Sequence, residues 1–199
     1  MGSSTAVGGD GRAATENDSR LRILVATAEV LERRGVTKLS MSEVAVQAGI
    51  SRMTLYRFFP SKEHLINEYT NWETDRLEAG LAMATAGLRG VDRVDATLKF
   101  LVDYQTSYSG LRMIDIEPGH VIARMSALMP TLKSRLAAIL SGDDAELAAG
   151  AVMRIIVSHY VVSGDDADEF LAQLRHAAGL RPSDAPVRRS GRVSRPRSS

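Results

Sequence analysis

The stretch that decides the fold is LSMSEVAVQAGISRMTLYRFFPSKEHL, residues 39–65. Ser40 and Glu43 have the spacing of a capping box, in which the serine hydroxyl accepts the amide of the glutamate and the carboxylate returns to the serine amide. A short helix is therefore expected over 41–48, with small apolar residues on one side. Gly49 ends this helix, because glycine adopts the left-handed conformation of a helix terminus without strain.

A second short helix is predicted over 52–58, capped by Ser51 and ended by Pro60. With about 3.6 residues per turn it has two faces. Its inward face carries Leu55, Phe58 and Phe59, and its outward face carries Arg52, Met53, Tyr56 and Arg57. Two short helices joined by a glycine turn, the second with a basic outer face, form a helix-turn-helix suited to the major groove of DNA. An ordinary corner in a helical bundle has the same spacing, so spacing alone leaves both interpretations open.

The rest of the chain shows helical periodicity and no convincing alternation of the strand type. A first helix is predicted over about 19–34, capped by Ser19 and ended by Gly35. A fourth is predicted over about 62–86, capped by Ser61. Five more are predicted over 92–108, 119–129, 131–140, 144–163 and 166–178. The fold class is therefore all-α, with about nine helices.

Charge is divided unevenly along the chain, although its sum is only +1. Residues 1–18 carry −2, 19–64 carry +4, 65–180 carry −6 and 181–199 carry +5. Because a basic segment attracts the phosphates of nucleic acid, residues 19–64 are predicted to form a DNA-binding domain and 65–180 a separate helical domain. The polar composition of the ends predicts a flexible N-terminal segment and a flexible Arg-rich tail. The tail either adds non-specific DNA affinity or is only solvated.

Several classes of function are excluded by what the sequence lacks. It has no cysteine, and its four histidines show no spacing typical of metal ligands. It also contains no nucleophile elbow and no phosphate-binding loop, so no enzyme activity, catalytic residue, metal or cofactor is expected. Residues 1–18 contain no apolar core of a signal peptide, and the longest apolar run, Ala148–Val162, is interrupted by Arg154 and His159. A cytoplasmic protein without a membrane span is predicted.

Residues 39–65 also resemble the signature of the TetR family of bacterial transcriptional regulators. The resemblance is close over residues 20–68 and has one departure, Phe58, where the family has His or Tyr. The matching positions are Ser40, Val44, Ala45, Ala48, Gly49, Ile50, Ser51, Thr54, Leu55, Tyr56, Phe59, Ser61, Lys62, Glu63 and Leu65. The resemblance implies an N-terminal three-helix DNA-binding domain with a helix-turn-helix, followed by a C-terminal helical domain that dimerises and binds a ligand.

The resemblance also implies which residues touch DNA. The predicted DNA contacts are Ser40, Ser51, Arg52, Met53, Thr54, Tyr56, Arg57 and Lys62. Phosphate contact is implied for Ser51, Thr54, Tyr56 and Lys62, and Lys62 lies at a helix N-terminus that suits an anion. Base contact is implied for Arg52 and Met53, at variable family positions that begin the recognition helix, and Arg57 suits either role. Packing, capping or simple solvation is the alternative for each.

Aromatic and methionine side chains of residues 65–180 form stripes at helical spacing. Such stripes are usually plain core, but in the family these helices enclose a cavity, and Met and Tyr suit an apolar ligand with a few polar groups. The predicted ligand-binding residues are Trp72, Phe100, Tyr104, Tyr108, Met125, Met153 and Tyr160. The family also pairs its last two helices with those of a second subunit, and completing the core of one subunit is the alternative.

Two functions are consistent with these features. The first is a ligand-responsive transcriptional regulator, expected to act as a repressor. Its homodimer would bind a near-palindromic operator in double-stranded DNA, and a small, largely apolar effector would release it. The second is a DNA-binding dimer with no small-molecule sensing, a nucleoid-type or constitutive regulator. A filled helical body would favour the second function, and an aromatic-lined cavity would count against it.

Overall fold

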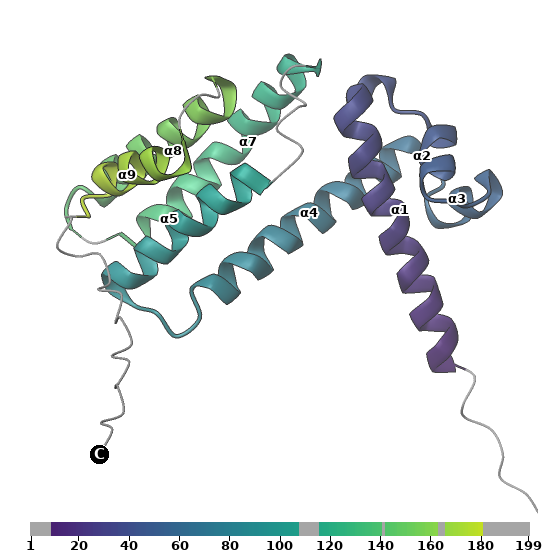
Figure 1. The fold of residues 1–199 in the computed structure, drawn as a ribbon, viewed down its shortest axis with the longest axis horizontal. Helices are drawn as coiled ribbons and strands as arrows, with labels where there is room; N and C mark the ends of the chain where they lie inside the picture. The colour runs from purple at the N-terminus through teal and green to yellow at the C-terminus, as the bar shows by residue number, and fades with distance from the viewer. Residues whose placement is uncertain (1–8, 108–115, 141, 163–165, 181–199) are drawn as a thin grey trace, which may run out of the picture.

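The chain folds into two groups of helices joined by one long helix (Figure 1). The computed structural model describes residues 9–107, 116–140, 142–162 and 166–180. Over these residues there are eight helices and no strand, which confirms the all-α prediction. We call the first group the head; it consists of α1 (Gly9–Lys38), α2 (Met41–Gln47) and α3 (Arg52–Phe58). We call the second group the body; it consists of α5 (Gly90–Ser107), α7 (Pro118–Ala137), α8 (Ala145–Val162) and α9 (Ala167–Ala177), and α4 (Lys62–Ala84) joins it to the head.

The head has its own apolar core, to which the first turns of α4 contribute. Its buried members include Ile23, Leu24, Val30, Leu31, Val44, Ala45, Leu55, Phe59, Leu65 and Tyr69. α2 and α3 have only seven residues each. Helices this short are unstable alone, so burial against α1 and α4 must hold them in place. At the edge of this core the guanidinium of Arg20 lies 5.2 Å from the Phe59 ring centroid and pairs with Glu68 of α4.

The body is held by a second core and by one buried ion pair. Phe170 of α9 is fully buried, and its ring stacks on His159 of α8 with centroids 3.8 Å apart. The buried Asp95 carboxylate accepts hydrogen bonds at 2.7 Å from Arg175 Nε and lies 2.7 Å from Lys99 Nζ. Burial alone raises the pKa of Asp95, but these two cations outweigh it and hold the pKa below its ordinary value. The ion pair between Asp95 and Arg175 therefore links α5 to α9.

The first helix differs from its predicted bounds at the start. α1 begins at Gly9, so part of the segment predicted to be flexible is helical, and Ser19 is not a cap. The Ser19 hydroxyl donates to the Thr15 carbonyl at 2.9 Å, which is a bond made inside a helix. The end of the helix is as predicted in character: Gly35 has φ 74° and ψ 175° and breaks the helical path, although three further residues resume it.

The predicted separation of helices 119–129 and 131–140 is wrong. α7 runs unbroken over Pro118–Ala137 with Pro130 inside it. An internal proline removes one backbone hydrogen bond and costs about 3 kcal/mol. The helix keeps its course because residues on both sides of the proline are buried in the body, Val121 before it and Leu136 after it.

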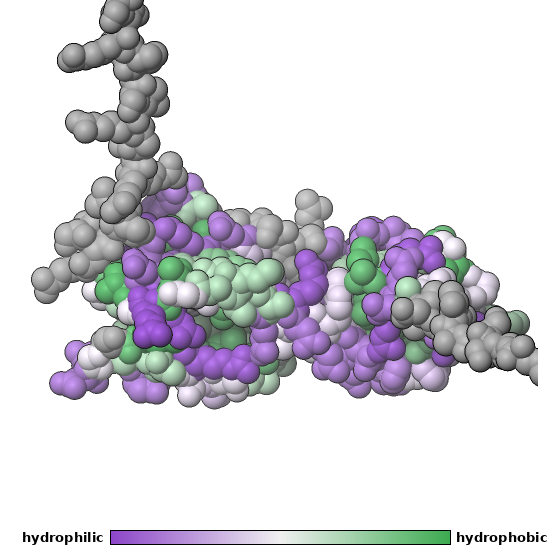
Figure 2. All heavy atoms as spheres, turned by 90° about the horizontal axis from the view of Figure 1, so that it is seen from below, coloured by the Kyte–Doolittle hydropathy of each residue, from purple (hydrophilic) through white to green (hydrophobic). Residues whose placement is uncertain are grey.

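α8 is long and apolar enough to cross a membrane by length and composition alone. One such helix is weak evidence for a span, because the helix of a soluble core passes the same test. Only 22% of this helix is buried within the chain. Several apolar residues of α8 are therefore exposed, among them Leu147, Val161 and Val162. Apolar surface lying between polar residues is also visible on the face of the body drawn in Figure 2.

Candidate nucleic-acid interface and effector site

The recognition helix α3 is fixed by its cap and by its inward face. Ser51 Oγ accepts the amide of Thr54 at 3.0 Å and lies 2.9 Å from the Thr54 hydroxyl. Leu55 and Phe59 are both fully buried. These anchors set the rotation of α3 about its axis, and they match the prediction that this side faces inward.

The opposite side of α3 faces solvent. Met53 is 84% exposed and Tyr56 43% exposed, while Arg52 and Arg57 are also exposed. The Arg57 guanidinium lies 5.1 Å from the ring centroid of half-buried Phe58. Phe58, the one departure from the family pattern, therefore makes a cation–π contact with Arg57. The predicted set of two guanidiniums, a phenol and a thioether therefore projects together from one rigid helix.

The two predicted DNA contacts farthest from α3 along the chain, Ser40 and Lys62, have structural partners of their own. Ser40 caps α2 by accepting the amide of Ser42 at 3.2 Å. The predicted capping box is incomplete, because the Glu43 carboxylate lies 3.2 Å from the Arg34 guanidinium instead of returning to Ser40. Lys62 Nζ donates to the Thr37 carbonyl at 2.9 Å. An ammonium has three donors, so this bond orients Lys62 and leaves it able to meet an anion.

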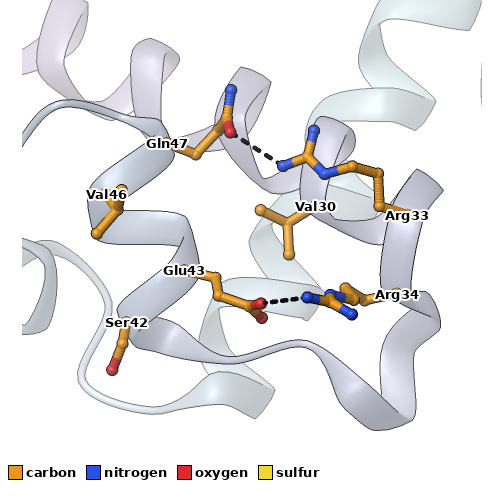
Figure 3. Close-up of a pocket in the computed structure, with 7 residues that line it drawn as sticks. All are labelled: Val30, Arg33, Arg34, Ser42, Glu43, Val46 and Gln47. Atoms are coloured by element: carbon orange, nitrogen blue, oxygen red, sulfur yellow. Dashed lines mark hydrogen bonds and ion pairs between the residues drawn. The ribbon is translucent and has the colours of Figure 1, made fainter.

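A shallow groove of about 520 Å³ separates α1 from α2 (Figure 3). Its polar side chains face one another across the groove: Arg33 Nη2 donates to Gln47 Oε1 at 2.9 Å, and Arg34 pairs with Glu43. Both interactions join the two helices. The interactions across this groove therefore hold α2 against α1, and both arginines take part in them.

The predicted ligand residues do not form one site. Three of them, Trp72, Phe100 and Tyr104, lie on the adjacent helices α4 and α5, where the Phe100 and Tyr104 ring centroids are 5.9 Å apart. Glu73 of α4 is buried. The Tyr104 hydroxyl donates to Glu73 Oε2 at 3.3 Å. Burial, together with the nearby carboxylate, raises the pKa of Tyr104 far above its ordinary value. Arg76 Nη1 lies 3.2 Å from Glu73 Oε1, and Arg76 Cζ lies 4.8 Å from the centroid of the Trp72 ring. Glu73 is thus paired with both Arg76 and Tyr104.

Two other predicted ligand residues, Met125 and Tyr160, line an apolar groove of about 400 Å³ between α7 and α8. The remaining lining residues are Val121, Ile122, Ser126, Met129, Pro130, Val157 and Val161. Met153 lies in the body core instead, with 5% of its surface exposed, and Tyr108 is outside the described residues. Of the predicted ligand residues that the structure describes, only Met125 and Tyr160 therefore line this groove.

Sequence reasoning missed three polar groups. Glu73 and Gln105 are buried, and within the described residues the Gln105 Nε2 has no hydrogen-bond partner. Both lie on helices with apolar stripes, and no local sequence pattern marks a buried polar residue there. Glu117 is the third, and its carboxylate accepts the backbone amides of Val36 and Thr37 in the head. No local pattern marks this contact, because it joins positions 81 and 80 residues apart.

Together, the exposed basic face of α3 and the short capped helix before it define a helix-turn-helix protein. Residues 23–69 match the family model described as "Bacterial regulatory proteins, tetR family". An uncharacterized HTH-type transcriptional regulator of Mycobacterium tuberculosis is 32% identical over 165 residues, which cover 74% of this chain and 78% of that protein. The chain belongs to the TetR family and is a transcriptional regulator; the family consists of DNA-binding regulators and not of enzymes, as predicted.

Two further similarities cover different parts of the chain. The HTH-type transcriptional repressor KstR of Mycolicibacterium smegmatis is 38% identical over 64 residues, covering 32% of this chain and 31% of KstR. A TetR-like regulator from Rhodococcus sp. RHA1 superposes with a TM-score of 0.65 at 22% identity, covering 81% of this chain and 93% of the other. A TetR-family regulator from Streptomyces coelicolor gives 0.64 at 18% identity, with coverage of 82% and 95%. The fold is thus shared along most of the chain.

Proposed function

We propose that this regulator is a cytoplasmic homodimeric repressor that binds a near-palindromic operator through α3 and leaves it when a small, largely apolar effector binds the body. Residues 19–64 serve as the DNA-binding domain and 65–180 as the effector and dimerisation domain. Arg52 and Met53 contact base edges. The phosphate contacts are Ser51, Thr54, Tyr56 and Lys62. The name of KstR supports repression in preference to activation.

One observation carries the DNA-binding part of this proposal. The outward side chains of α3 are exposed, and the helix beneath them is seated on Leu55 and Phe59, which have no exposed surface. An arginine can give two hydrogen bonds to a guanine edge only if its backbone is held in register with the groove. A rigid helix with a basic outer face meets that requirement.

Dimerisation is supported by the surface of α8. Leu147 and Val162 are each 72% exposed, and Val161 is 47% exposed. A second copy of the chain that covered this face with its own last two helices would bury these residues. In a symmetric pair of this kind the same surface is used on both subunits.

The effector part of the proposal is supported by the α7–α8 groove. Its walls are mostly apolar, and Pro130 cannot donate to the carbonyl of Ser126 four residues before it, since proline has no amide proton. An apolar effector with one hydroxyl would find a place for its ring or chain against Met125 and an acceptor at Ser126. If the groove proves not to bind small molecules, the second candidate function, a DNA-binding dimer without an effector, is favoured instead.

Selection from random-sequence duplex DNA tests the DNA-binding proposal. The enriched duplexes are expected to contain two inverted half-sites whose centres are about 34 Å, one turn of the helix, apart, because two α3 helices read them symmetrically. We call the most enriched sequence the selected duplex. Enrichment of single, unpaired half-sites, or no enrichment, would be incompatible with a dimer that reads DNA through α3.

Thermal-shift screening against apolar metabolites that carry a hydroxyl tests the effector proposal. A compound present at about 100 times its Kd adds about 2.7 kcal/mol and should raise the Tm by about 5 °C or more. Met125→Trp, which fills the groove, should abolish the shift. Met83→Trp, at a site on α4 that is 76% exposed, is the matched control and should preserve it. If no compound shifts the Tm, or if both variants respond alike, the groove is not the effector site.

A further inference from the structure

The segment before α7 reaches across to the head at one residue. Glu117 occupies the N-cap position of α7, yet its side chain makes no capping bond to that helix. Its Oε2 accepts the amide of Val36 at 2.5 Å and its Oε1 accepts the amide of Thr37 at 2.8 Å. One carboxylate of the body thus accepts two consecutive amides in the last turn of α1, just after the break at Gly35. The start of α7 lies beside the end of α1 in Figure 1.

The turn is shaped to admit this carboxylate. Gly35, the residue just before the two amides, has φ 74°, a conformation that favours glycine. A Cβ at position 35 would lie 2.6 Å from Glu117 Cδ and 2.8 Å from Oε2. Any other residue there would push the carboxylate away as well as strain the backbone. The glycine that ends the main part of α1 therefore also makes room for a contact from the body.

The Thr37 peptide group connects this contact to the DNA side of the head. Its N–H binds Glu117, and its carbonyl accepts Lys62 Nζ at 2.9 Å. Lys62 begins α4 and is one of the proposed phosphate contacts. Beyond Glu117, α7 continues directly into the groove, where Val121 and Met125 are lining residues. The groove and the proposed phosphate contact are thus joined by two hydrogen bonds and one helix.

The charge of Glu117 is consistent with such a role. Burial raises the pKa of its carboxyl, but hydrogen bonds from Thr37 and Val36 outweigh burial and hold the pKa below its ordinary value. The side chain is therefore a charged acceptor near neutral pH. Hydrogen bonds to a charged acceptor are stronger than neutral ones, which suits a contact that must hold two groups of helices together.

We propose that Glu117 is a positioning residue that fixes the orientation of the head relative to the body by binding the turn after Gly35, and that operator affinity depends on this contact. The inference rests on the proposed function, since it assumes that α3 reads DNA. A dimer presents two heads at once. A head that can turn on α4 must lose that freedom before both α3 helices fit one duplex, and this loss weakens binding.

Glu117→Ala tests the proposal with two separate readouts. Amide hydrogen exchange at Val36 and Thr37 should become about tenfold faster, because each amide loses its acceptor, while the amides of Val30 and Val44 in the head core keep their rates. The Kd for the selected duplex should rise about tenfold, within the usual range of coupling between sites. Glu117→Gln keeps the shape and one neutral acceptor, so smaller changes of both quantities are expected; it serves if the alanine variant does not fold.

The control is Asp75→Ala, which removes one exposed acidic charge from α4. It should leave exchange unchanged, and it shows how much the loss of a negative charge alone alters DNA affinity. Faster exchange with weaker binding supports the proposal. Faster exchange with unchanged or tighter binding, or unchanged exchange at Val36 and Thr37, overturns it. If the wild-type protein enriches no duplex, the proposed function fails, while the exchange rates still decide whether Glu117 holds the turn.

Discussion

The variant in which Arg52 is replaced by alanine and Tyr56 by phenylalanine is expected to bind the selected duplex about 100-fold more weakly than the wild type. Loss of a guanidinium that reads a base edge costs about 1–3 kcal/mol, and loss of a hydroxyl that binds phosphate about 1 kcal/mol. Both side chains are exposed on α3, so neither substitution opens a cavity. The Tm and the dimer mass from sedimentation should stay the same, and fluorescence anisotropy with labelled duplex measures the Kd.

Two controls separate base reading from bulk charge. Arg89→Ala removes the same charge from the exposed link between α4 and α5 and should change the Kd little. A duplex with scrambled half-sites should bind the double variant and the wild type with more similar affinity, since the base contact is already absent there. Unchanged affinity of the double variant for the selected duplex would refute the contact assignment. If Arg89→Ala weakened binding as much as the double variant does, the loss of affinity would come from bulk charge and not from base reading.

Local sequence signals predicted the caps and faces of the helix-turn-helix region well. Ser51 and Ser61 cap their helices through the amides of Thr54 and His64, as their spacing indicates. The inward and outward faces of α3 follow from helical periodicity alone. All the proposed DNA contacts lie within a short stretch of 23 positions, from Ser40 to Lys62, so their relative placement depends only on α2, α3, the start of α4 and the turns between them.

The same kind of signal failed where tertiary contacts override it. Pro130 is a strong local sign of a helix end, yet packing of α7 on the body carries the helix through it. Glu43 has the spacing of a capping box, yet Arg34 of another helix offers a charged partner. Serine is a common helix cap, but the residues before Ser19 are also helical, so Ser19 lies within α1 and not at its start.

Where the predicted ligand residues lie was foreseen only in part, because their placement depends on which helices pack together. A stripe of aromatic or methionine residues shows that a face is apolar, and it does not show which neighbour covers that face. Tyr104 therefore belongs to a packed cluster with Glu73, whereas Tyr160 lines an open groove. Glu117 could not have been found from sequence, since its meaning depends on the fold bringing α7 to the turn at Val36.

The second large effect expected of this protein is the dependence of operator binding on salt. Three cations on the proposed DNA face, Arg52, Arg57 and Lys62, make about six in a dimer. Each of them displaces condensed counterions when it enters the DNA surface, whether it ends at a base edge, as proposed for Arg52, or at a phosphate. The logarithm of the association constant should then fall against the logarithm of the salt concentration with a slope of about −5. Between about 50 and 200 mM salt the affinity should fall by about a thousandfold.

This salt titration, made by anisotropy with the selected duplex, is the most direct measurement of whether α3 and its neighbours lie against the DNA backbone. The account predicts a straight line with a slope near −5, and a shallower line for a variant in which Lys62 is replaced by alanine. An affinity that does not change with salt would mean that these cations do not meet phosphate, and it would contradict the assignment of α3 as the DNA-reading helix.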